Sequence, residues 1–156
     1  MDAWVGSVIA VAGTLLGSVA GYLFQRLNAG RTERFARDER LRQERMAAYS
    51  AYAGAVMDLR RAVVSLWFLL QRTESEDPEL LAAYTDADRY GAAAAASRFR
   101  VQLLANDPRL VELAAGAAAP IDSIREAADA TELKAHETRC VEGVDAFIVA
   151  AGAQLR

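Results

Sequence analysis

The chain has 156 residues, of which 53% are hydrophobic and 25% are charged, and this length favours one domain plus an appended segment. A single cysteine, Cys140, excludes an intrachain disulfide and agrees with a reducing cytoplasmic compartment. Residues 46–156 carry ten Arg and one Lys against sixteen Asp and Glu, a net charge of −5. Such an acidic domain is a poor nucleic-acid binder, because duplex affinity depends on neutralising phosphates.

Residues 3–24 form a run of 22 residues without a formal charge. As a helix, this run would be roughly 33 Å long, enough to cross a hydrocarbon core of about 30 Å. We therefore predict an N-terminal transmembrane helix. A buried core helix and a cleaved signal peptide stay open as alternatives, although the first rarely extends so far and the second needs positive charge before its apolar region. An interfacial amphipathic helix needs a charged face, which this run lacks.

The charges around this run predict its orientation. Asp2 is the only charged side chain before it, whereas seven Arg follow it within residues 25–45. Basic residues near a span stay on the cytoplasmic side, so we expect the N-terminus outside and the C-terminus inside a bacterial inner membrane. The basic residues nearest the span are candidates for contact with anionic lipid headgroups: Arg26, Arg31, Arg34 and Arg37.

Three glycines inside the predicted span, Gly13, Gly17 and Gly21, are spaced by four and lie on one helical stripe. In lipid, small residues let two helices approach closely, so this stripe predicts a homo-oligomer, with a dimer as the simplest case. The alternative is that transmembrane helices are simply richer in glycine than other helices. A larger ring enclosing a pore is a further alternative, although the run holds no ionisable residue that would mark an ion path.

Residues 25–45 are rich in Arg and Glu and predict a charged helical stalk. Opposite charges recur four residues apart, as in Glu33 with Arg37 and Arg40 with Glu44. Each such pair stabilises an isolated helix by about 0.2–0.5 kcal/mol. The stalk is either a lipid-contacting segment or a solvated spacer. Asn28-Ala29-Gly30 resembles a helix stop, so the helix either bends there or runs straight through.

Residues 46–156 predict an antiparallel four-helix bundle in an all-α protein. Short turns are signalled by Asp77-Pro78 and Asn106-Asp107-Pro108, where Asp suits the N-cap and Pro the first helical position. We expect helices over residues 79–105, from 108 onward, and from Asp129 or Thr131 to about Leu155. Pro120 predicts a kink or break near Ala118. The first helix of the bundle carries an apolar stripe that steps by three and four: Tyr49, Tyr52, Val56, Leu59, Val63, Leu66 and Leu70.

The apolar run over residues 62–70 should be central to the core, with Trp67 and Phe68 as candidate interface residues. The heptad stripes would also suit an intermolecular coiled coil, so bundle and oligomer are not separable from sequence. Among polar residues, Glu132, His136 and Cys140 fall four apart on one stripe. A metal site or a Cys–His nucleophile would need partners that the chain does not supply, so we expect no catalytic residue, no metal and no cofactor.

The layout of a span, an Arg/Glu-rich stalk (RTERFARDERLRQER) and an Ala-rich helical domain resembles small single-pass membrane proteins of high-GC Gram-positive bacteria. The resemblance implies no assigned activity. We therefore predict a non-enzymatic, membrane-anchored scaffold that self-associates through its span and presents its bundle to a cytoplasmic protein partner. Two alternatives remain: a pore-forming or membrane-disrupting protein, such as a phage-type lysis protein or defence effector, and a ligand-binding helical bundle.

Overall fold

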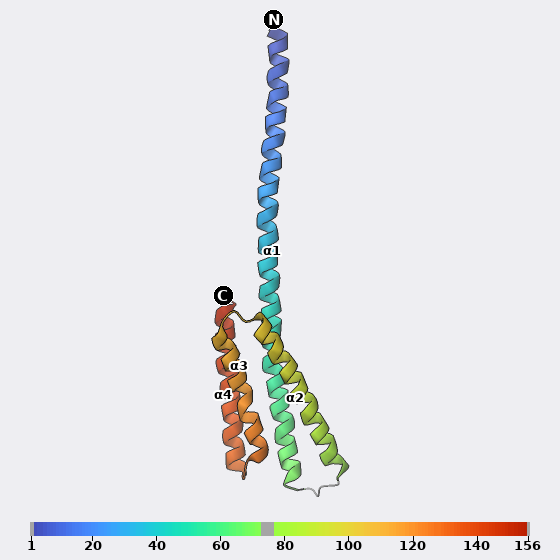
Figure 1. The fold of residues 1–156 in the computed structure, drawn as a ribbon, viewed down its shortest axis with the longest axis vertical. Helices are drawn as coiled ribbons and strands as arrows, with labels where there is room; N and C mark the ends of the chain where they lie inside the picture. The colour runs from blue at the N-terminus through green and yellow to red at the C-terminus, as the bar shows by residue number, and fades with distance from the viewer. Residues whose placement is uncertain (1, 73–76, 156) are drawn as a thin grey trace. The chain divides into compact units, whose positions relative to one another are not determined.

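The computed structural model describes the backbone of residues 2–72 and 77–155, and the side chains of Tyr22, 34–72 and 77–155 (Figure 1). This part of the chain forms four helices and no strand: α1 (Asp2–Leu70), α2 (Pro78–Leu104), α3 (Pro108–Glu126) and α4 (Ala130–Gln154). The prediction of an all-α protein is therefore confirmed. The chain divides into two compact units, Met1–Leu41 and Arg42–Arg156.

Within the first unit the backbone is helical, and α1 continues through Asn28–Gly30, so the stop signal at that point does not end the helix. The predicted span over residues 3–24 lies outside the described side chains, apart from Tyr22. Among the residues that the structure does describe, no helix is long and apolar enough to cross a bilayer.

Three aspartates begin the helices of the second unit. Asp77 accepts a hydrogen bond from the Glu79 N–H, and Asp107 accepts one from the Arg109 N–H, each ahead of a proline at the first helical position. Asp129 begins α4 and accepts hydrogen bonds from two backbone N–H groups of its first turn. These caps satisfy donors that a helix N-terminus leaves without partners, which is why the sequence signals located the starts of the helices well.

Of the kink or break expected near Ala118, a break is not present, because α3 runs unbroken from Pro108 to Glu126 with Pro120 inside it. Proline removes one intrahelical hydrogen bond, but buried side chains on both sides of Pro120 stay on one face of the helix and hold it against the core. Those buried residues are Leu110, Ala114, Ala117, Ile121 and Ile124. The helix ends at Glu126, and the C-cap residue Ala127 is buried against the core.

Successive helices of the second unit run in opposite directions and enclose one hydrophobic core (Figure 1). The apolar stripe of α1 is buried over most of its length, with Leu59 partly buried and Leu70 exposed where the helix ends. Helix α4 contributes Leu133, Cys140, Val144, Phe147 and Ala151. Helix α2 buries one residue every two turns, namely Leu80, Ala87, Ala94 and Val101, so it packs through a narrow face.

Helices α3 and α4 approach each other closely at Gly143. A Cβ atom at Gly143 would lie 2.9 Å from the Cα of Ala117. The neighbouring Cys140 thiol, on the same face of α4, donates to the Ala117 carbonyl oxygen at 3.4 Å. The small residues at this crossing therefore bring the two backbones together.

Candidate interaction surface

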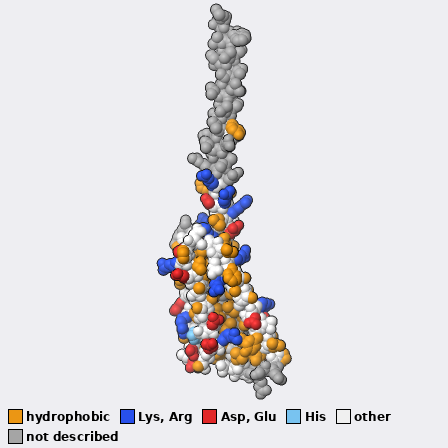
Figure 2. Space-filling view, viewed as in Figure 1, with side chains coloured by type: hydrophobic (Ala, Val, Ile, Leu, Met, Phe, Trp, Pro, Cys, Tyr) orange, Lys and Arg blue, Asp and Glu red, His pale blue; other side chains and the backbone are white. Residues whose placement is uncertain are grey.

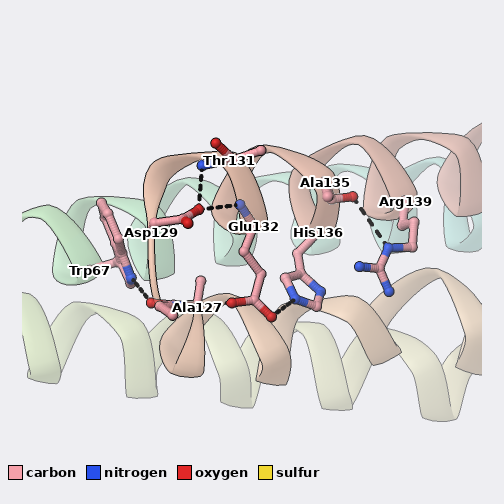
Figure 3. A network of polar contacts seen from close by, with 9 residues as sticks. Trp67, Ala127, Asp129, Thr131, Glu132, Ala135, His136 and Arg139 are labelled. Atoms are coloured by element: carbon pink, nitrogen blue, oxygen red, sulfur yellow. Dashed lines mark hydrogen bonds and ion pairs between the residues drawn. The ribbon is translucent and has the colours of Figure 1, made fainter.

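Trp67 occupies the core near the turn between α3 and α4. Its side chain is 6% exposed, and its indole Nε1–H donates to the Ala127 carbonyl oxygen at 2.9 Å (Figure 3). Ala127 is the C-cap of α3, where carbonyl groups lack an intrahelical partner, so the indole satisfies one of them. Trp67 is therefore buried and hydrogen-bonded inside the bundle. Of the two candidate interface residues, Trp67 and Phe68, only Phe68 is accessible.

Phe68 is 47% exposed and lies edge-to-face against Trp67, with ring centroids 5.0 Å apart and an interplanar angle of 84°. Burial and the hydrogen bond fix the indole of Trp67 in place. The Phe68 ring therefore packs against a fixed surface on its inner side. A supported aromatic ring loses little conformational entropy when a partner covers it, which makes such a residue a good anchor for an interface.

A cavity of about 510 Å³ opens at the same end of the bundle, lined by residues from three helices. Leu70 of α1 and Tyr84 of α2 form its apolar part, whereas its charged part comes from α3: Asp122, Arg125 and Glu126. Leu81, one turn before Tyr84 on α2, is 69% exposed. Figure 2 shows hydrophobic side chains gathered over the end of α1 and the start of α2. Phe68 and Leu70 lie on different faces of α1, so we use the name end surface for the exposed apolar side chains around the turn between α1 and α2: Phe68, Leu70 and Leu81.

The interior of the bundle holds two titratable groups next to each other. Tyr52 is 1% exposed, and its hydroxyl donates to the Ala114 carbonyl oxygen. Burial raises the pKa of Tyr52 to about 12, with Arg98 acting in the opposite direction. Burial also raises the pKa of the Cys140 thiol, against the charge of Arg60. Since only a thiolate is a good nucleophile or metal ligand, Cys140 is held in its unreactive form.

These raised pKa values predict a loss of stability in alkali. Near pH 7 both groups are neutral in the folded and unfolded chains. As the pH rises, the unfolded chain loses these protons first while the folded chain keeps them, so the free energy of unfolding falls. For Tyr52 alone the loss should reach about 2 kcal/mol by pH 12. Urea unfolding between pH 8 and 12 measures this slope, and Tyr52→Phe should make it shallower; an unchanged slope would contradict the assignment.

The Glu132–His136 pair lies in the first two turns of α4, next to the Asp129 N-cap. The Asp129 carboxylate accepts hydrogen bonds from the backbone N–H groups of Thr131 and Glu132, both at 2.8 Å (Figure 3). Glu132 in turn accepts a hydrogen bond from the Ala128 N–H at 2.9 Å, so its carboxylate reaches back to the residue before the N-cap. The His136 Nε2 lies 3.7 Å from the other Glu132 oxygen. No group of three or more metal-ligating side chains occurs among the described residues.

The structure locates some of the predicted site residues. The structure describes only the backbone at Gly13, Gly17, Gly21, Arg26 and Arg31, so the association stripe and much of the lipid-contact set stay predictions. Arg34 and Arg37 are exposed.

Sequence reasoning missed the cavity beside Leu70, because Tyr84 and Asp122 come from helices whose relative rotation no local pattern reveals. The one available signal was the apolar Leu81, which falls beside the buried stripe of α2 rather than on it.

Residues 46–155 match the model of a known family, the KilB plasmid transfer protein family. The chain belongs to this family. The KilB match covers α2, α3, α4 and the part of α1 that lies in the bundle, and therefore includes the whole end surface. No curated protein and no solved structure matches the chain. The KilB match identifies the family of the helical domain. An origin in high-GC Gram-positive bacteria and a membrane span over residues 3–24 stay predictions.

Proposed function

We propose that this chain is a membrane-anchored helical interaction protein that serves plasmid transfer. The observation that carries the proposal is the family match, because it extends over the entire bundle and because its members are named for plasmid transfer. The Trp67 ring is held by a hydrogen bond and packs against the exposed Phe68 ring, an arrangement that suits protein recognition.

The anchor in this proposal is the uncharged run over residues 3–24, with the following Arg residues on the cytoplasmic side of the membrane. Association of two or more chains through Gly13, Gly17 and Gly21 would place several bundles side by side. Several copies of a weak docking surface raise the avidity for a partner without any new contact.

The end surface is the proposed docking site for a protein of the transfer apparatus. Leu70 and Tyr84 offer an apolar recess, and two acidic groups, Asp122 and Glu126, flank it with Arg125. This combination fits a partner segment that inserts an apolar side chain next to a basic residue. A contact with protein is favoured over a contact with DNA because residues 46–156 have a net charge of −5.

Plasmid transfer frequency in mating tests the proposal. Donors carry the plasmid with this gene deleted and are complemented with the wild-type chain or with single variants. Phe68→Ser removes the anchor of the end surface. Val149→Ser is the matched control, because Val149 is 74% exposed on α4, away from the end surface. We expect deletion and Phe68→Ser to lower the transfer frequency and Val149→Ser to leave it at the wild-type level.

Both variant chains are compared by thermal unfolding, so that a loss of fold is distinguished from a loss of docking. Wild-type transfer from the deletion donor would exclude a role in transfer. Equal transfer by the two stably folded variants would exclude the end surface as the docking site while leaving the role in transfer intact.

A further inference from the structure

The two halves of α2 are held to the bundle in different ways. In the second half, Val101 is fully buried, and the Arg45 Nε–H of α1 donates to the Leu104 carbonyl oxygen at 2.9 Å. The charge of Arg98 also acts on the buried Tyr52, where it opposes the rise of the hydroxyl pKa that burial causes. Polar contacts and a buried side chain therefore fix the C-terminal end of α2 against α1.

The first half of α2, residues 78–90, has no polar tie to another helix. Among the described residues, every hydrogen bond and ion pair of its side chains stays within α2, as for Arg89 and Asp86, whose charged groups lie 3.0 Å apart. Its buried side chains are Leu80 and Ala87. We call residues 78–90 the α2 arm, which is held in the bundle by apolar contacts.

Cavities lie on both sides of the buried stripe of the α2 arm. The recess of about 510 Å³ lies where Leu70 and Tyr84 meet α3. A second cavity, of about 210 Å³, lies between α1 and α2, where Ala62 and Ser65 face Ala83. Figure 1 shows the ribbons of α1 and α2 diverging toward the N-terminal end of α2. The arm is therefore the part of α2 that packs least closely against its neighbours.

This packing determines how easily the arm detaches. Cavities remove dispersion contacts that close packing supplies, so they lower the free energy needed to separate the arm from the bundle. Regions held by few buried contacts open locally, at a free energy below that of global unfolding. Once detached, a helical segment as short as the arm is marginal in water and loses its helical hydrogen bonds. The second half of α2 keeps its contacts, so the opening should end between Ala87 and Ala94.

We propose that the α2 arm unfolds locally and reversibly while the rest of the bundle stays folded. Leu81 and Tyr84 belong to the arm, so the recess beside Leu70 is formed only when the arm is closed. A partner that fills the recess would bind the closed form, and the fraction of closed chains would set its apparent affinity. This role in docking rests on the proposed function, whereas the motion is a property of the bundle alone.

Thiol labelling of the full chain in detergent micelles tests the motion. Ala87→Cys places a thiol in the arm, and Ala94→Cys, two turns further along the same buried stripe, is the matched control. Ala87 is 9% exposed and Ala94 is 6% exposed, so both positions are covered in the closed bundle. The native Cys140, fully buried in the core, reports global unfolding in both chains. Peptide mass spectrometry should show labelling at position 87 about tenfold faster, or more, than at position 94.

Urea supplies the second arm of the experiment, because its effect grows with the surface that an opening exposes. Between none and about 2 M urea, labelling at position 87 should change little, whereas labelling at position 94 and at Cys140 should accelerate steeply. Equal labelling rates at positions 87 and 94, or the same urea dependence at both, would overturn the proposal.

Hydrogen exchange of the unsubstituted chain repeats the comparison without a cysteine that could disturb the packing. Amides of residues 82–90 should exchange about tenfold faster than those of residues 94–101, and equal protection of the two segments would overturn the proposal. Neither readout involves plasmid transfer. A failed transfer assay would therefore leave the motion standing, whereas equal protection would exclude the motion and leave a role in transfer intact.

Discussion

Replacement of Phe147 by Ala should lower the free energy of unfolding by about 3–5 kcal/mol. Phe147 is fully buried and joins α4 to α1 through two aromatic contacts. Its ring centroid lies 5.2 Å from that of Tyr52 and 6.0 Å from that of Tyr49, both edge-to-face. Truncation removes both contacts and leaves a cavity that the surrounding helices can fill only in part. Urea unfolding of the full chain in mild detergent, followed by circular dichroism, measures the effect.

Phe35→Ala is the matched control for this prediction, because the same atoms are removed from a side chain that is 75% exposed. The control should change stability by no more than about 0.5 kcal/mol. If the two variants unfolded at the same urea concentration, Phe147 would not be a core residue and the position of α4 in the bundle would be wrong.

Gly143→Ala should destabilise the bundle by about 1–3 kcal/mol. The added Cβ would meet the Cα of Ala117 at 2.9 Å, and the Ala117 nitrogen and the Gly116 carbonyl oxygen at 3.5 Å. All three atoms belong to the backbone of α3, so no flexible side chain can move aside. The two helices must separate, which also disturbs the hydrogen bond between the Cys140 thiol and Ala117. The same urea titration detects this loss.

Gly54→Ala serves as the control, and we expect it to raise the free energy of unfolding rather than lower it. Gly54 lies within α1 with open space where its Cβ would be, so the substitution only improves helix propensity. It should raise stability by about 0.5–1 kcal/mol. A stabilising Gly143→Ala would show that α3 and α4 do not approach each other as described.

The stability changes expected for Gly54→Ala and Gly143→Ala have opposite signs. This difference shows which parts of the fold could be predicted from the sequence and which could not. The starts of three helices were predictable because Asp and Pro act through local hydrogen bonds and a fixed backbone angle. The core stripe was predictable because helical periodicity places the same residues on one face. Which glycine permits a close approach depends on how two helices cross, and no local pattern contains that information.

The candidate site was predictable only in part. Trp67 and Phe68 are adjacent aromatics in one apolar run, and the sequence did not distinguish the buried ring from the exposed one. The distinction is made by the Ala127 carbonyl, which comes from sixty residues further along the chain. Similarly, the recess beside Leu70 gathers residues from α1, α2 and α3. Helix capping and periodicity act within one helix, whereas the position of this site depends on how α1, α2 and α3 are rotated relative to one another.

The proposed function requires residues 3–24 to anchor the helical domain to a membrane. The most direct measurement is fractionation of cells that express the full chain or a chain lacking residues 3–24, with the membranes washed in alkaline carbonate. We expect the full chain to stay in the membrane pellet and the shortened chain to appear in the supernatant. Release of the full chain into the supernatant would contradict the account.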